Sequence, residues 1–288
     1  MSILILGAQG NLGSQLNKIL SVDYQVTAWD RSDFDALDFK LLASKIRELS
    51  PELIINCVAY NAVDRCEDKS DYELAYQLNA ELPAHLADLA LEINAVLVHY
   101  STDYVFSGLE TKKEFSESDT PNPLNKYGES KFAGEREVER RAQSGLGYYL
   151  IRTSKLFGPL GSSPQTKPSF FVIMLNLART KKEITVVNEE LSCFTYTLDL
   201  AEATKRLWEL EVPFGIYHLV NEGPCTWYEA AEELFRLKKM SISLRAVRSE
   251  NLLRAARRPK FSALQNTKVR KMRSWRVALK DYLENHST

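Results

Sequence analysis

Short apolar segments alternate with amphipathic segments along the first half of the chain, and this alternation limits the folds available to it. Apolar runs suited to buried strands occupy 2–6, 53–58 and 95–100. Apolar residues at helical spacing lie between them, most clearly at 11–20 and 71–93. Strands that alternate with helices pair in parallel and carry helices on both faces. The sequence therefore predicts an α/β fold, a doubly wound parallel sheet of the Rossmann type.

The first strand runs directly into a glycine-rich turn, Gly7-Ala-Gln-Gly10-Asn-Leu-Gly13, which opens the first helix. Glycines at this turn let the backbone approach a diphosphate, and the helix N-terminus offers it free N–H groups. The spacing G-x-x-G-x-x-G differs from the commonest fingerprint, and a turn that only packs helix on strand is the alternative. We expect a dinucleotide site here.

Beyond residue 154 the alternation loosens, and 158–168 is rich in Pro, Gly and Ser. We therefore expect a dinucleotide-binding domain over 1–154, completed by about 184–218. Residues 155–183 and 219–288 are expected to form a smaller C-terminal α/β substrate-binding lobe.

Composition excludes few functions. The net charge of −1 over 288 residues indicates no particular class of binding partner. Residues 236–280 carry 15 Lys plus Arg against one acid, Glu250, so the lobe suits an anionic ligand, although solvated helix faces have the same composition. The four cysteines are scattered, without zinc spacing, and we expect no metal, free thiols and a cytoplasmic protein. No apolar run reaches membrane-spanning length.

The second strand ends at Asp30-Arg31, where the adenosine ribose of a dinucleotide is usually met. Asp30 suits ribose hydroxyls and Arg31 suits a 2′-phosphate, so NADH and NADPH both remain open. Asp38 and Phe39 are placed to flank the adenine, and a helix N-cap is the alternative for Asp38.

A Tyr and a Lys four residues apart, Tyr127 and Lys131, share one face of a predicted helix. An ammonium beside a phenol lowers the phenol pKa and makes it a usable acid near neutrality. Ser101 and Thr102 follow the strand 95–100, at the sheet edge where such folds bind ligands. We expect Tyr127 to protonate a carbonyl oxygen that Thr102 also contacts.

Taken together, the segments 7–13, 59–67, 99–108, 123–135, 151–154, 215–223, 226–227 and 257–268 resemble those of the dTDP-4-dehydrorhamnose reductase family, within the extended short-chain dehydrogenase/reductases. The likeness extends over nearly the whole chain. It implies an NAD(P)H-dependent oxidoreductase that reduces the 4-keto group of a nucleotide-linked 6-deoxy sugar, and a homodimer.

The resemblance also implies residue roles. The cofactor would contact a set that surrounds the glycine turn and the strand ends: Gly7, Gln9, Gly10, Asn11, Leu12, Gly13, Asp30, Arg31, Asp38, Phe39, Ala59, Tyr60, Asn61, Tyr100, Tyr127 and Lys131. The catalytic group would be Tyr127, Lys131 and Thr102, with Lys131 also binding the nicotinamide ribose. The sugar would contact Val63, Thr102, Asp103 and Tyr104. From the arginine-rich character of the lobe we expect Arg258 to hold the diphosphate of the sugar nucleotide, with Lys155 beside the sugar.

Two departures from the family pattern fall on the substrate side. Lys155 stands where the family commonly has Trp, and 188–195 lacks the usual Gly and Pro. Two alternatives therefore stay open: a reductase of a different nucleotide-linked 4-keto sugar, and a non-catalytic NADP-binding subunit resembling the methionine adenosyltransferase β subunit. Nucleic-acid binding is disfavoured because the basic lobe has few aromatic residues.

Overall fold

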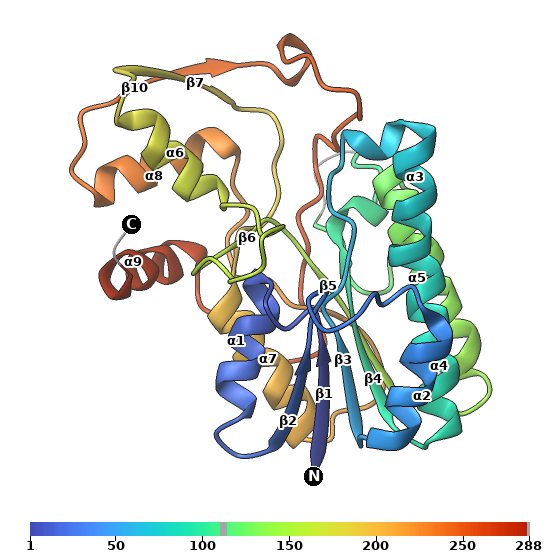
Figure 1. The fold of residues 1–288 in the computed structure, drawn as a ribbon. Coiled ribbons are helices and arrows are strands. Elements are labelled where there is room, and N and C mark those ends of the chain that lie inside the picture. Colours follow the sequence, from blue (N-terminus) through green and yellow to red (C-terminus); the bar gives the residue numbers. More distant parts are fainter. Residues whose placement is uncertain (110–113, 287–288) are drawn as a thin grey trace.

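The computed structural model describes residues 1–109 and 114–286, and a six-stranded parallel sheet lies at its centre (Figure 1). The strand order is β2-β1-β3-β4-β5-β9, and every neighbouring pair is parallel. The strands are β1 (Ser2–Leu6), β2 (Gln25–Trp29), β3 (Leu53–Asn56), β4 (Val96–Thr102), β5 (Tyr148–Thr153) and β9 (Gly215–His218). The predicted doubly wound α/β fold is confirmed.

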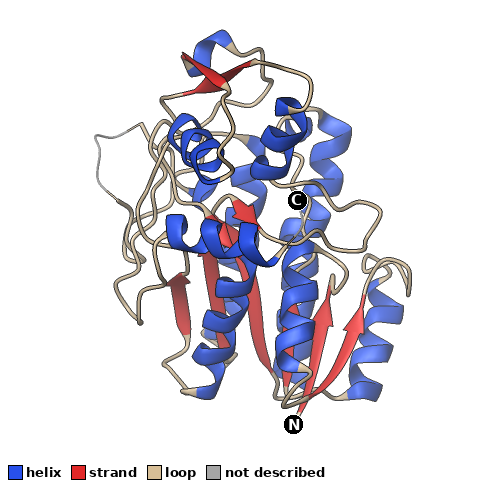
Figure 2. Ribbon diagram, turned by 90° about the vertical axis from the view of Figure 1, so that its left-hand side faces the viewer, coloured by secondary structure: helices blue, strands red, loops and turns tan. Residues whose placement is uncertain are grey.

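Helices cover both faces of this sheet, because successive strand residues point to opposite sides (Figure 2). Ile3 and Ile5 of β1 pack on one face with α1 and α7, whereas Leu4 and Leu6 join the core of the other face. The helices are α1 (Asn11–Leu20) and α7 (Thr197–Glu209) on the first face, with α2 (Phe39–Leu49), α4 (Leu82–Glu92) and α5 (Lys126–Ala142) on the second.

The stretch predicted as one long helix, 71–93, contains a change of helical type. It consists of α3 (Lys69–Tyr76), the π-helical turn η2 (Gln77–Glu81) and α4. A π turn inserts an extra residue and redirects the side chains around it, and such turns are frequent near functional sites. Here it buries Asn79 between α5 and the loop that follows β3.

A smaller lobe sits above the carboxyl ends of the strands (Figure 1). Its elements are β6 (Leu156–Phe157), α6 (Phe170–Ala178), β7 (Glu183–Val187), β8 (Thr195–Tyr196), α8 (Trp227–Leu237), β10 (Ser243–Val247) and α9 (Trp275–Asn285). An aromatic core that includes Phe171, Phe194 and Trp275 holds it together. The segment 184–218 is divided: β7 pairs with β10 in this lobe, and only α7 and β9 join the large sheet. The segment 184–218 was expected to complete the dinucleotide-binding domain. In the structure its first strand, β7, belongs to the smaller lobe.

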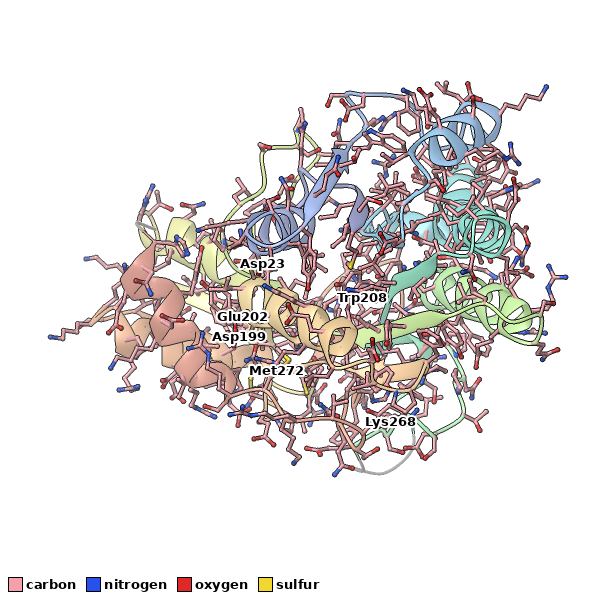
Figure 3. The ribbon with its side chains drawn as sticks, turned by 90° about the horizontal axis from the view of Figure 1, so that it is seen from below. Asp23, Asp199, Glu202, Trp208, Lys268 and Met272 are labelled. Carbon is pink, nitrogen blue, oxygen red and sulfur yellow. The ribbon has the colours of Figure 1, made fainter. Side chains whose placement is uncertain are left out.

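The lobe is tied to the sheet domain through the start of α7, which lies across the view from below (Figure 3). The Asp199 carboxylate accepts hydrogen bonds from Arg273 at 2.8 and 2.9 Å and from the Asn221 side chain at 2.6 Å. Arg273 also pairs with Asp281 of α9. One carboxylate thus joins the large sheet's helix layer to two segments of the lobe.

Cys57, Cys66, Cys193 and Cys225 are free, and the last three are buried. Two further short elements, the 3₁₀ turns η1 (Arg65–Glu67) and η3 (Asp103–Val105), follow β3 and β4, and a third, η4 (Ser249–Asn251), follows β10. Within 1–109 and 114–286, no helix has both the length and the apolar character needed to cross a bilayer.

The contact between α5 and η2 gives a test of this packing. A Cβ added at Gly134 would lie 2.0 Å from the backbone oxygen of Asn79, so Gly134→Ala must push the helix away from the π turn. We expect a loss of about 1–3 kcal/mol in the free energy of unfolding, measured by urea titration. Arg136→Ala, at an exposed position on the same helix, is the control and should change it by less than about 0.5 kcal/mol. Equal effects of the two substitutions would contradict the close packing.

Candidate functional site

A cavity of about 870 Å³ lies where the strands' carboxyl ends meet the lobe. This is the place where open α/β sheets bind ligands, next to the point at which the strand order reverses between β1 and β3. Its walls are formed by residues within six stretches of chain, 6–13, 29–37, 57–65, 100–104, 153–156 and 163–170, together with Asp71, Leu74, Leu78, Tyr127, Lys131 and Trp227.

The glycine turn forms the floor of the cavity, and two of its glycines are required by geometry. Gly7 has φ +76°, a left-handed conformation that favours glycine. A Cβ on Gly13 would lie 2.1 Å from the Gly7 carbonyl oxygen, so α1 approaches β1 more closely than any side chain permits. Gly10 stands at the α1 N-cap and provides no side-chain cap, which leaves the first N–H groups of α1 without a capping side chain. These features fit a dinucleotide diphosphate.

A loop of the lobe lies across the glycine turn. Asn11 holds it from two sides: its Oδ1 accepts from the Gly161 N–H at 2.8 Å, and its Nδ2 donates to the Lys167 carbonyl at 3.2 Å. The Ser163 N–H donates to the Gln9 carbonyl at 3.1 Å. Asn11 and Leu12 line the cavity, whereas Gln9, which was expected to contact the cofactor, lies outside its lining.

The adenosine side of the cavity differs from the expectation. Asp30 and Arg31 line it, and the Asp30 carboxylate already accepts backbone N–H groups from Gln9 at 2.9 Å and from Arg31 at 2.8 Å. Asp38 does not reach the cavity, because it is the N-cap of α2 and accepts from the Leu41 N–H at 3.1 Å. Phe39 does not line the cavity either, because its ring packs on His85, with ring centroids 3.9 Å apart.

The residues that occupy the expected adenine wall are Phe34, Asp35, Ala36 and Leu37. They belong to the irregular segment between β2 and α2, which has no periodic pattern from which a sequence reading could locate them. The Phe34 ring is fixed by an edge contact with Trp29, the centroids being 5.3 Å apart.

The loop after β3 brings Ala59, Tyr60 and Asn61 into the cavity wall as expected. Asn79, buried on the π turn, holds this loop: its Oδ1 accepts the Tyr60 N–H and its Nδ2 donates to the Tyr60 carbonyl, both at 2.9 Å. The same amide donates to Ser130 Oγ of α5 at 2.9 Å. Asn79 therefore ties the cofactor side of the loop to the helix that carries Tyr127.

The structure brings Tyr127, Thr102 and Lys131 together on the wall of this cavity. Thr102 ends β4 beside Tyr127, and its hydroxyl donates to the Asp103 carboxylate at 3.2 Å. The Tyr104 ring packs edge-on against Tyr127 with centroids 5.9 Å apart. Burial raises the pKa of Tyr127 well above its usual value. The phenol is therefore protonated at neutral pH.

The expected direct effect of Lys131 on that phenol is not seen in this structure. The Lys131 ammonium donates to the Tyr100 carbonyl at 2.6 Å, and it is not among the groups that shift the pKa of Tyr127. Burial lowers the pKa of Lys131 to about 8. Tyr100 contributes its backbone here, because its hydroxyl is bonded to Thr204 of α7 at 2.7 Å.

The expected sugar side contains Val63, Asp103, Tyr104 and Lys155, all lining the cavity. Asp103 is buried and accepts from Ser262 Oγ at 2.5 Å, and burial raises the pKa of its carboxyl.

Lys155 has φ +39°, a strained backbone for a residue with a side chain. Its ammonium lies 3.8 Å from the centre of the Trp227 ring and 3.4 Å from the Glu190 carbonyl oxygen. Burial lowers the pKa of Lys155 to about 8.

Arg258, which was expected to bind the substrate diphosphate, does not line the cavity. Its guanidinium is bidentate to Asp64, with N–O distances of 2.6 and 2.7 Å, and also donates to the Ala256 carbonyl, so it lies outside the cavity lining. Besides Arg31, Lys131 and Lys155, the cations that line the cavity are Arg65, paired with Asp71 at 2.8 Å, and Lys167. Neither was predicted; Arg65 belongs to the segment 59–67 that carries the resemblance, and Lys167 gives no sequence signal beyond its loop.

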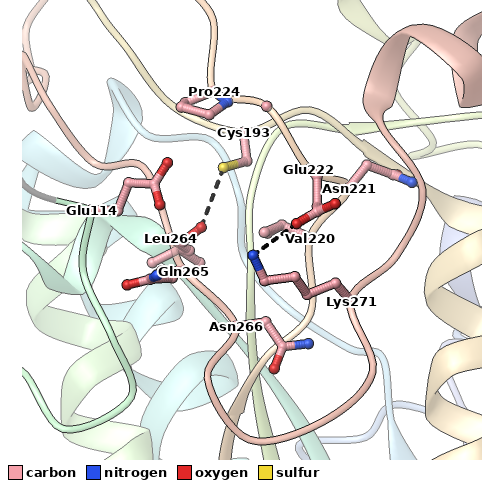
Figure 4. A pocket seen from close by; sticks show the side chains of 11 residues that line it. Glu114, Cys193, Val220, Asn221, Glu222, Pro224, Leu264, Gln265, Asn266 and Lys271 are labelled. Atoms are coloured by element: carbon pink, nitrogen blue, oxygen red, sulfur yellow. Dashed lines mark hydrogen bonds and ion pairs between the residues drawn. The ribbon is translucent and has the colours of Figure 1, made fainter.

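A second cavity, of about 200 Å³, lies elsewhere and contains none of the predicted site residues (Figure 4). Lys271 pairs with Glu222 across it at 2.9 Å, and the buried Cys193 thiol faces the Leu264 carbonyl at 3.5 Å. Burial raises the pKa of Cys193 to about 12, so the thiol is un-ionised at neutral pH. The groups expected to act in catalysis, Thr102, Tyr127 and Lys131, line the larger cavity instead.

A glycine turn on a doubly wound sheet, with a Tyr and a Lys four residues apart beside it, defines the class of extended short-chain dehydrogenase/reductases. A family model described as the RmlD substrate binding domain matches residues 1–288. The dTDP-4-dehydrorhamnose reductase of Streptomyces griseus is 35% identical over 288 residues, which cover 96% of this chain and 91% of that protein. The spore coat polysaccharide biosynthesis protein SpsK of Bacillus subtilis is 33% identical over 291 residues, covering 99% and 98%.

Solved structures agree with these relatives. The crystal structure of dTDP-4-dehydrorhamnose reductase from Bacillus anthracis in complex with NADP superposes with a TM-score of 0.91 at 32% identity, covering 99% of each chain. The chain belongs to the dTDP-4-dehydrorhamnose reductase family. The predicted family, and with it the prediction of an NAD(P)-dependent oxidoreductase, is confirmed.

The glycine turn allows a direct test of cofactor binding. A Cβ at Gly10 would lie 3.3 Å from the Gly7 carbonyl oxygen, so a small side chain fits there once that carbonyl shifts by a few tenths of an ångström. Gly10→Asp should abolish NADPH binding, because its carboxylate would occupy the diphosphate space and repel it. Fluorescence titration with NADPH measures the affinity, and Gly10→Ala is the control, expected to bind more weakly than wild type but measurably. Unchanged affinity in a folded Gly10→Asp protein would refute the assignment.

Proposed function

We propose that the chain reduces the 4-keto group of a nucleotide-linked 6-deoxy sugar, namely dTDP-4-dehydro-L-rhamnose to dTDP-L-rhamnose, with NADPH or NADH. The observation that carries this proposal is the placement of Tyr127, Thr102 and Lys131 on the wall of the cavity whose floor is the glycine turn. Relatives named for this reaction match the chain over nearly its whole length.

The catalytic roles follow from the environment of each group. A bound reduced nicotinamide would supply the hydride. The Tyr127 phenol, kept protonated by burial, would donate its proton to the oxygen that becomes a hydroxyl. Thr102 lines the cavity beside Tyr127 and would orient the same oxygen. The Lys131 ammonium, held by the Tyr100 carbonyl, would bind a ribose hydroxyl and stabilise the phenolate left after proton transfer.

The adenosine end supports a preference for NADPH. Both oxygens of Asp30 accept backbone N–H groups, so its carboxylate is already engaged. The Arg31 guanidinium is exposed and forms no ion pair within the described parts of the chain, which leaves it available for a 2′-phosphate. The relative solved with NADP is consistent with this preference.

Lys155 supports a second candidate, a sister reductase for a different nucleotide-linked 4-keto sugar. An ammonium in the cavity wall offers hydrogen bonds and charge to the ligand, where an aromatic ring would offer only an apolar face. It would suit a sugar with more accessible hydroxyls or an acidic group. The alternative of a non-catalytic regulatory subunit draws no support from the named relatives, which are reductases. A homodimer and a cytoplasmic location stay predictions.

Replacement of the proposed acid tests the reaction. Tyr127→Phe should lower kcat by about 100-fold or more while NADPH affinity stays within about twofold, because only the transferable proton is lost. Loss of NADPH absorbance with dTDP-4-dehydrorhamnose measures kcat. Tyr148→Phe, outside the cavity, is the matched control and should keep wild-type activity. Near-full activity of Tyr127→Phe would show that another group is the acid.

The choice between the two sugars is tested at Lys155. If the ammonium sets specificity, Lys155→Trp should raise kcat/KM for dTDP-4-dehydrorhamnose by roughly tenfold relative to wild type, because it replaces a charge by an apolar face. Lys155→Met removes the charge at similar length and separates charge from stacking. The assay compares dTDP-, UDP- and GDP-linked 4-keto sugars. Wild-type turnover of dTDP-4-dehydrorhamnose that Lys155→Trp leaves unchanged would favour the unmodified family reaction.

A further inference from the structure

A short irregular segment of the lobe, 161–167, is hydrogen-bonded to the glycine turn at both of its ends, and we call it the strap. It lies between β6 and α6. The Gly161 N–H donates to Asn11 Oδ1 at 2.8 Å, and Asn11 Nδ2 donates to the Lys167 carbonyl at 3.2 Å. Both polar atoms of the Asn11 side chain therefore bind the strap.

The backbone of the strap also packs directly on the turn. A Cβ at Gly161 would lie 2.2 Å from the Gln9 carbonyl oxygen and 2.6 Å from the Gly10 carbonyl carbon, so a side chain there forces a shift. The Ser163 N–H donates to the same Gln9 oxygen at 3.1 Å. The turn is held between β1 and α1, whereas the strap has no regular structure, so we expect the strap to be the part that moves.

The turn and the strap form two walls of the large cavity. Gly10 to Gly13 line it on one side, and Ser163 and 165–167 line it on the other. The first turn of α1, which has no capping side chain, belongs to the first wall. The exposed Lys167 adds a cation to the second wall. A helix N-terminus and a cation both favour an anionic ligand, and the diphosphate of the dinucleotide is such a ligand.

We propose that Asn11 is a positioning residue that latches the strap over the diphosphate of the dinucleotide, so that a segment of the lobe forms the outer wall of the cofactor site. This role differs from the direct cofactor contact expected for Asn11 from the sequence. It also assigns to the cofactor a part of 155–183, which was expected to serve the substrate. The inference rests on the cofactor assignment and is independent of which sugar is reduced.

Hydrogen exchange in the cofactor-free protein tests the latch itself. Asn11→Ala removes the acceptor of the Gly161 N–H and the donor to the Lys167 carbonyl. We expect the strap amides to exchange about tenfold faster, the size expected when such hydrogen bonds are lost. Asn17→Ala, on the same helix, is the matched control, because its side chain accepts from Ser21 Oγ at 3.1 Å and lies outside the cavity lining. Unchanged exchange of the strap in Asn11→Ala would overturn the latch.

Cofactor affinity tests the consequence of the latch. Asn11→Ala should weaken NADPH binding by about tenfold and raise the dissociation rate constant by a similar factor, because the outer wall is released. Fluorescence titration and stopped-flow displacement measure both quantities without a sugar substrate. Asn17→Ala should stay within about twofold of wild type. Faster exchange of the strap without weaker NADPH binding would overturn the proposal.

A double-variant cycle separates a latch from a direct cofactor contact. Gly161→Ala displaces the strap and leaves the Asn11 side chain in place. If Asn11 acts through the strap, each single variant and Asn11→Ala/Gly161→Ala weaken NADPH binding by about tenfold, because the second change has nothing left to release. If Asn11 binds the cofactor directly, the effects multiply to about 100-fold, and the proposal is wrong. Thermal unfolding without cofactor checks each fold, and Asn11→Ala alone decides the matter where Gly161→Ala unfolds.

The diphosphate of a sugar nucleotide is the other anion that these two walls suit, and dTDP is the probe for it. We expect dTDP affinity in Asn11→Ala to stay within about twofold of wild type, because the strap is bound to the glycine turn. Weaker dTDP binding with unchanged NADPH binding would assign the strap to the sugar nucleotide and overturn the proposal. Neither titration contains a keto sugar, so a failure of the proposed reduction leaves both results interpretable.

Discussion

The contact between the Gly7 carbonyl and Gly13 sets the geometry on which the rest of the site depends. A Cβ at residue 13 would lie 2.1 Å from that oxygen, so α1 can begin directly above the end of β1 only because both residues are glycine. This closeness places the uncapped N-terminus of α1 at the edge of the sheet. The ends of β3 and β4, which are in register with β1 and with each other, then face the same cavity. A dinucleotide and the Tyr127 group can meet there because the parallel pairing aligns these strand ends.

Burial determines the protonation of the groups in that cavity. It raises the pKa of Tyr127 and lowers the pKa values of Lys131 and Lys155 to about 8. An acid that keeps its proton at neutral pH and an ammonium close to its titration range are suited to the transfer of one proton. The hydrogen bond to the Tyr100 carbonyl fixes the direction of the Lys131 ammonium.

The parts of the fold that follow from periodic patterns were predictable from the sequence, and the irregular parts were not. The strands and helices of the large sheet lie within a few residues of their predicted places, because one-sided burial produces the pattern that identifies them. Asp38 and Phe39 were expected beside the adenine. The sequence allowed Asp38 to be either an adenine contact or a helix N-cap, and in the structure it is the N-cap of α2. The cavity wall where the adenine was expected is formed by 34–37, an irregular segment without a periodic sequence pattern. The division of 184–218 was missed because pairing of β7 with β10 is a contact between distant segments.

Charge balance in the lobe shows why composition alone misled the expectation for Arg258. Three of the arginines in 236–280 have carboxylate partners outside that segment: Asp64 pairs with Arg258, Glu190 with Arg254, and Asp199 with Arg273. Two of these carboxylates lie on the sheet domain, so these cations hold the lobe over the strand ends instead of forming an open anion site. The cations on the cavity wall come from five different segments: Arg31, Arg65, Lys131, Lys155 and Lys167. A ligand in this cavity would therefore meet cations contributed by both parts of the chain.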